Sequence, residues 1–307
     1  MVIAHNISAL NTYKSLGIAG GSADKSMEKL SSGYRINKAA DDAAGLSISE
    51  KMRSQIRGLN QASTNASNGV SMIQTAEGAL NEEHSILQRM RELAVQAATD
   101  TNADDDRIAL QSEMEQLTSE INRIGTTTQF NGMNILDGTK TGDNKVFFHV
   151  GANKDQTIST EFGDMRAKEL GIVGLVANKG SVGANGTSVG NFVATSNITN
   201  NSGADEYALN ITTRDGANNA IQAIDLAIKK VSDERSKYGA IQNRLEYTIN
   251  NLNTTAENMT AAESTVRDVD MAEEMMNLTK NNILQQAAQA MLVQANSRPQ
   301  QALQLLQ

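Results

Sequence analysis

The chain has 307 residues and a formal net charge of −8, and it contains no cysteine, no tryptophan and one proline. The missing cysteine excludes disulfides, thiolate chemistry and cysteine-based zinc sites, and the negative charge argues against nucleic acid as a partner. Aromatic residues are only 3% of the chain, so aliphatic side chains and methionine must build the core, which suits long helices packed side by side. Because no run of about 18 apolar residues is present, we expect no membrane insertion.

The N-terminal segment carries a weak helical stripe that glycines interrupt. The glycines are Gly17, Gly20 and Gly21. The apolar residues of the stripe are Ile3, Ile7, Leu10, Met27, Leu30 and Tyr34. Such a helix is marginal without tertiary packing, so we expect it to need a partner elsewhere in the chain.

Residues 41–100 form the first strongly periodic segment. One apolar residue recurs every seven positions: Leu59, Ala66, Ile73, Leu80, Leu87 and Ala94. A sustained seven-residue repeat predicts a long helix with a coiled-coil seam. The acidic turn at 101–106 favours the start of a second helix, which we expect to end near Gly125 and to fold back on the first.

The middle of the chain loses this helical pattern. Short strand-like runs at 145–150, 156–160 and 207–212 predict a few β-hairpins near 131–175. Residues 177–205 are rich in Gly, Ser, Asn and Thr and are too polar to form an independent core.

The helical period returns at Ala217 and continues to the end. A second seven-residue row should pair with the first long helix: Ile224, Val231, Tyr238, Leu245, Leu252 and Met259. The last stretch, from about Val266 to Gln307, is apolar almost all the way round, so it must be buried in something larger. We expect it to pack against the other terminus and against copies of itself, which makes the chain a polymer subunit.

The sequence therefore predicts a mainly α fold. It consists of a long antiparallel helical bundle or coiled coil formed by both termini, a small β-hairpin region, and a short Gly/Ser/Asn-rich middle.

No constellation of residues supports catalysis. His5, His84 and His149 fall in three different predicted elements, and no HExxH motif or phosphate-binding loop is present. The run Asp104–Asp106 lacks the spacing of a calcium loop and is better explained as a solvated helix cap. We therefore expect no enzyme activity, no metal and no cofactor.

Three methionines, Met271, Met275 and Met276, lie close together near the start of the last helix. Such a cluster suits either a promiscuous binding face or packing at an oligomer interface. We favour oligomer packing.

Four segments resemble the bacterial flagellins. They are residues 30–49, 88–98, 128–137 and 282–306, and the resemblance covers about 1–175 and 205–307. The differences are small: Tyr34 stands where leucine is common, and Gln307 where the family often ends in arginine.

The resemblance implies a structural subunit that assembles into the flagellar filament for motility. Residues 1–40 with 265–307 would form an inner two-helix assembly domain. Residues 41–176 with 206–264 would form a helical bundle domain with β-hairpins, and 177–205 would be a short exposed variable region.

The resemblance also implies roles for single residues. Gln289 and Gln294 would line the central channel, where neutral amides stay wetted without trapping a passing chain. Inter-subunit packing would fall to Ile3, Ile7, Leu10, Leu278, Leu284, Met291 and Leu292. The patch for the vertebrate Toll-like receptor for flagellin would be Gln88, Arg89, Glu92, Leu93 and Glu113. Candidate O-glycosylation sites are Ser181, Thr187, Ser188, Thr195, Ser196 and Thr199.

The implied partners are other copies of the chain, an export chaperone, junction and cap proteins, and a host innate immune receptor. The implied location is extracellular, after export through the flagellar secretion channel without a cleaved signal peptide. Two alternatives stay open: a hook–filament junction protein, and a secreted adhesin or immune ligand.

Overall fold

The computed structural model describes residues 6–174 and 207–304 of the chain. The helices are α1 (Ile7–Ser32), α2 (Ala43–Ala97), α3 (Asp104–Thr127), α4 (Ala167–Leu170), α5 (Arg214–Arg267) and α6 (Met271–Gln304), with a 3-10 turn at Gly142–Asn144. The strands are β1 (Gln129–Phe130), β2 (Met133–Asn134), β3 (Val146–His149), β4 (Thr157–Thr160), β5 (Val173–Gly174) and β6 (Tyr207–Ala208). The predicted fold class, a helical bundle with a small β region, is confirmed.

The chain divides into two compact units. We call residues 1–57 with 255–307 the terminal unit and residues 58–254 the central unit. The boundary lies inside α2 and α5, so each of these long helices contributes to both units.

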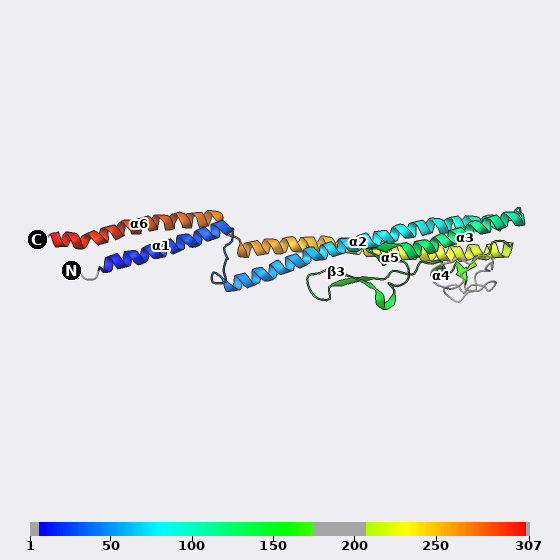
Figure 1. Ribbon diagram of the computed structural model, residues 1–307, viewed down its shortest axis with the longest axis horizontal. Helices are drawn as coiled ribbons and strands as arrows, with labels where there is room; N and C mark the ends of the chain where they lie inside the picture. The colour runs from blue at the N-terminus through cyan, green and yellow to red at the C-terminus, as the bar shows by residue number, and fades with distance from the viewer. Residues whose placement is uncertain (1–5, 175–206, 305–307) are drawn as a thin grey trace. The chain divides into compact units, whose positions relative to one another are not determined.

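In the central unit, α2, α3 and α5 run side by side (Figure 1). Arg91 of α2 pairs with Asp225 of α5 at 2.7 Å, while Ser63 bonds to Asn253 at 3.1 Å, so the two helices are antiparallel. Both predicted seven-residue rows face this core: all six positions of the α2 row are buried, as are the α5 row positions from Ile224 to Leu252. Their burial confirms the long-helix prediction.

Within the described part of the chain, three separate two-stranded antiparallel sheets accompany these helices. The β3–β4 hairpin pairs Val146 with Thr160 and His149 with Thr157. It can approach α2 closely because glycines remove side chains there. A Cβ atom at Gly69 would lie 3.0 Å from the Phe148 ring, and one at Gly58 would lie 3.0 Å from the Ala152 Cβ.

Two buried amides tie the irregular segments to α3. The Gln111 side chain donates to the Leu209 carbonyl at 3.0 Å and accepts from the Ile211 N–H at 2.9 Å. The Asn122 side chain accepts from the Ala167 N–H at 2.8 Å. These bonds satisfy backbone groups that would otherwise be buried without a partner.

In the terminal unit, α1 and α6 lie antiparallel (Figure 1). Asn6 caps α1 by accepting from the Ala9 N–H at 3.1 Å, and its amide also donates to the Ala295 carbonyl at 2.8 Å. The helix passes through Gly17, Gly20 and Gly21 without a break, although these glycines interrupt its apolar stripe. Packing on α6 outweighs the cost of roughly 1 kcal/mol that each glycine brings.

The last helix begins later than the sequence indicated. Helix α5 ends at Arg267 and α6 starts only at Met271. The Val269 N–H donates to the Gly33 carbonyl at 3.1 Å. The Asp270 side chain then caps α6 by accepting from the Ala272 N–H at 2.9 Å.

Candidate assembly surface

The seam between α1 and α6 consists mostly of small or polar side chains. Its residues recur at alternating steps of three and four, the spacing of a coiled coil, and all are buried or half-buried. They are Ala9, Thr12, Leu16, Ala19, Ala23, Ser26 and Leu30 from α1, and Glu274, Leu278, Asn281, Gln285, Ala288, Leu292 and Ala295 from α6. This seam buries little apolar area, so the pair gains limited stabilisation from its own contact.

Most of the large apolar side chains of the same two helices lie outside the seam. Leu10 is 68% exposed, Ile283 61% and Met291 59%. The others are Ile7, Tyr13, Ile18, Met27, Met271, Met275, Met276, Leu284 and Val293. Soluble monomers rarely leave so much apolar surface exposed in one region, and such surfaces mark sites of interaction.

The predicted packing residues therefore fall into two groups. Ile7, Leu10, Leu284 and Met291 are exposed and free to meet another molecule. Leu278 and Leu292 belong to the seam and are half-buried, while Ile3 lies outside the described residues.

The two predicted channel-lining glutamines are both exposed. Gln289 and Gln294 are five residues apart on α6, so an ideal helix directs their side chains about 140° away from each other. They do not form one continuous polar strip.

A clasp joins the break between α5 and α6 to the segment after α1. The Arg267 guanidinium lies 4.6 Å from the centre of the Tyr34 ring and donates to Glu50 at 2.9 Å. Tyr34 forms a β-bridge with Asp268. Cation–π contact, ion pair and backbone bridge together fix the chain where both helical connections meet.

A second surface lies on α2 and α3. Arg89 donates to Glu113 at 2.9 Å and to Glu92 at 3.2 Å, and these bonds, Glu113 first, raise the pKa of Arg89. Gln88 is exposed beside them. Leu93 is completely buried in the central core, which corrects its predicted place in the receptor patch, because a buried core side chain cannot contact a partner.

The structure also reveals a residue that sequence reasoning missed. The Glu83 carboxyl of α2 is fully buried, and neither of its oxygens has a hydrogen-bond partner. Burial, reinforced by the negative charge of Asp164, raises the pKa of Glu83 to about 9. The sequence signal that could have identified Glu83 as buried is its position in the apolar repeat, seven residues after Ala76 and seven before Met90.

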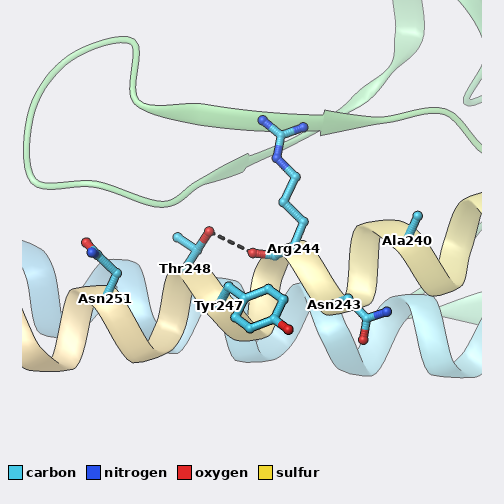
Figure 2. Close-up of a pocket in the computed structure, with 6 residues that line it drawn as sticks. All are labelled: Ala240, Asn243, Arg244, Tyr247, Thr248 and Asn251. Carbon is cyan, nitrogen blue, oxygen red and sulfur yellow. Dashed lines mark hydrogen bonds between the residues drawn. The ribbon is translucent and has the colours of Figure 1, made fainter.

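A surface hollow on α5 is lined by Ala240, Asn243, Arg244, Tyr247, Thr248 and Asn251 (Figure 2). It offers no carboxylate or histidine, and the Thr248 hydroxyl donates to the Arg244 carbonyl at 2.8 Å. Within residues 6–174 and 207–304, no group of His, Asp and Glu side chains could hold a metal, and no helix is long and apolar enough to cross a membrane.

Comparison with known proteins identifies the family to which the long terminal helices belong. Residues 3–141 match the bacterial flagellin N-terminal helical region, and residues 221–306 match the bacterial flagellin C-terminal helical region. The chain belongs to the bacterial flagellin family. A flagellin of Halalkalibacterium halodurans is 50% identical over 306 residues, and a flagellin of Bacillus subtilis is 50% identical over 317, each covering all of both chains.

A solved structure shares the flagellin fold at much lower identity. It is a putative flagellar hook-associated protein from Vibrio parahaemolyticus, with a TM-score of 0.56 and 16% identity, and it covers 74% of this chain and 100% of its own. That likeness concerns the fold alone. The full-length identity to flagellins favours a filament subunit over a junction protein.

As a flagellin, the chain is a structural protein of the flagellar filament, which is extracellular and serves motility, and it is not an enzyme. The candidate glycosylation residues Ser181, Thr187, Ser188, Thr195, Ser196 and Thr199 lie outside the described residues.

Proposed function

We propose that this flagellin polymerises through the outer apolar face of the α1–α6 pair. The supporting observation is the distribution of side chains: small and polar residues fill the seam, while Ile7, Leu10, Leu284 and Met291 are exposed. Burying those side chains against other copies would contribute about 1.5 to 3 kcal/mol each. The polymer would thus supply the apolar burial that the single chain lacks.

A pair of matched leucines tests this surface. Leu284 on α6 is 48% exposed and Leu226 on α5 is 49% exposed. We expect Leu284→Ser to raise the monomer concentration needed for salt-induced filament growth by about tenfold or more, and Leu226→Ser to change it little. Equal effects of the two changes would contradict the assigned surface. Deletion of residues 271–307 should abolish growth, as negative-stain microscopy would show.

We infer that residues 1–40 with 265–307 act as the inner assembly domain, and residues 41–176 with 206–264 as the bundle domain. The expected variable region, 177–205, lies outside the described residues. The side chains of Gln289 and Gln294 point in different directions from α6. Either both line the channel, each from a different side of the helix, or only one of them lines it. Export assays on Gln289→Leu and Gln294→Leu separately should show impaired secretion for each residue that lines the channel. Normal secretion and filament length in both variants would refute the role.

We further propose that the chain is exported through the flagellar secretion channel, with an export chaperone and with junction and cap proteins as partners; its membership of the flagellin family supports this proposal. Co-purification of the chain from the cytoplasm with a chaperone, dependent on residues 271–307, would support it. Secretion that persists when the flagellar export apparatus is deleted would refute the route.

We also propose a receptor surface for the vertebrate Toll-like receptor for flagellin, made by Gln88, Arg89, Glu92 and Glu113. Arg89 holds Glu92 and Glu113 in one charged cluster across α2 and α3. We expect Arg89→Ala to weaken binding of monomer to receptor by about tenfold. The control is Arg53→Ala, which removes another exposed ion pair from α2. Equal receptor affinities of the wild type, Arg89→Ala and Arg53→Ala would rule the surface out.

A further inference from the structure

The sulfur of this chain is entirely thioether sulfur, because the sequence has 13 methionines and no cysteine. Any two-electron oxidant that attacks sulfur must therefore attack methionine. The susceptibility of a thioether to such attack depends on its exposure to solvent. The structure places a group of methionines at each extreme of exposure, with Met52, Met133 and Met259 between them.

The methionines of the central core are closed to solvent. Met72 is 2% exposed, Met165 is 1% exposed, and Met90 and Met114 are fully buried. These side chains fill the space among α2, α3 and the loop before α4, so an oxidant reaches them only when the bundle opens.

The methionines of the α1–α6 pair are open. Met276 is 67% exposed, Met291 59%, Met27 58%, Met275 51% and Met271 50%. Met271 and Met275 are four residues apart and share a face of α6, and Met276 is adjacent to them. All three flank Glu274 and Leu278 of the seam, so the packing of α6 on α1 turns these thioethers outward.

We propose that these five thioethers are a modification site for peroxide, and that their oxidation blocks assembly of the filament. In the step, a sulfur lone pair attacks one oxygen of hydrogen peroxide and the O–O bond breaks. Sulfur gains an S=O bond and loses two electrons, and the second oxygen leaves as hydroxide and takes the proton that the first oxygen releases, which forms water. Each thioether thereby becomes a sulfoxide, and each peroxide becomes one water.

The effect on assembly follows from where the oxygen is placed, and it rests on the proposed assembly surface. A sulfoxide converts a flexible apolar side chain into a polar one. If copies of the chain bury that surface, the new oxygen is buried without a designed partner, and each such group opposes assembly by about tenfold in concentration. Oxidation at Met133 of β2, which is 41% exposed but lies in the central unit, should have no such effect.

The first experiment maps the reaction. Monomeric protein is treated with dilute hydrogen peroxide and digested, and sulfoxide at each methionine is followed over time by mass spectrometry. We expect the five thioethers of the terminal pair to react at least tenfold faster than Met72, Met90, Met114 and Met165. Equal rates in the two groups would overturn the assignment of the site.

The second experiment measures assembly before and after peroxide. It compares the wild type with Met133→Leu, in which leucine conserves the volume of the side chain, and it then reduces the sulfoxides of each oxidised sample with methionine sulfoxide reductases and dithiothreitol. We expect peroxide to abolish filament growth in both proteins, and reduction of the sulfoxides to restore it.

Each outcome has one meaning. Wild-type protein that carries the five sulfoxides and still assembles would overturn the proposal, and so would reduction of the sulfoxides without recovery of growth. Recovered growth supports the proposal. Failure of the assembly surface itself shows separately, as equal effects of Leu284→Ser and Leu226→Ser on untreated protein.

Discussion

The buried carboxyl of Glu83 makes this protein's stability depend on pH in an unusual direction. Its pKa is raised from 4.5 to about 9, first by burial and then by Asp164, whose own carboxylate pairs with Arg166. The groups from α5 are the uncharged hydroxyl of Tyr238 and the carboxylate of Glu234. No cation pairs with Glu83 in the described structure. Between pH 4.5 and pH 9 the folded protein therefore keeps a proton that the unfolded chain has released.

The sign and size of the effect follow from linkage. Because the folded state binds one more proton in this window, the free energy of unfolding falls by about 1.4 kcal/mol per pH unit. The loss amounts to about 4 kcal/mol between pH 4.5 and 7.5, and about 6 kcal/mol by pH 9, after which both states are ionised. Glu83→Gln removes the titrating group, so we expect the variant to gain stability over the wild type steadily as pH rises.

Urea unfolding of dilute monomer, followed by helical circular dichroism at half-unit steps from pH 5 to 8.5, measures this difference. Taking the difference between variant and wild type cancels the titration of every other group. Glu82→Gln makes the same chemical change at an exposed neighbour on α2 and should show no such trend. A difference between Glu83→Gln and wild type that stays constant within 1 kcal/mol over the whole range would refute the burial argument.

Two further predictions concern packing. Gly78→Ala should stabilise the monomer by about 0.5 to 1 kcal/mol in the same urea assay, because a Cβ there meets nothing within 4 Å and alanine is the better helix former. Gly58→Ala should lack that gain, since its Cβ would press on Ala152; an equal gain at both sites would contradict the close approach of the hairpin. Gln111→Leu should cost about 2 to 4 kcal/mol by leaving two buried backbone groups near β6 unbonded, whereas Gln116→Leu, exposed on the same helix, should cost little.

The sequence predicted the parts of this fold that repeat. Rows such as Leu59 to Ala94 identify a buried seam because a seven-residue period has one structural explanation over so many turns. Glu83 occupies a position in that pattern, but a carboxyl is ordinarily solvated, so only three-dimensional burial could show that it lies inside.

The assembly surface was predictable in its location and not in its detail. Helix α6 is apolar on nearly every side, and periodicity alone could not tell which face meets α1. The structure places Leu292 in the seam and Met291 outside it, a distinction of one residue that depends on the partner helix. The persistence of α1 through its three glycines likewise depends on tertiary packing that local propensity does not contain.

The seam of α1 and α6 has one more consequence, which concerns the length of the subunit. A three-four repeat returns to the same helix face after a slip of seven residues, a displacement of about 10 Å, so the spacing of the seam residues does not by itself fix the alignment. The polar contacts at the two ends of the seam do: Asn6 reaches the Ala295 carbonyl only in one alignment, and Tyr34 meets Asp268 only in the same one. These two contacts fix the alignment of α1 on α6. Every copy that enters a helical lattice must have the same length, and here hydrogen bonds at the two ends of the seam set that length.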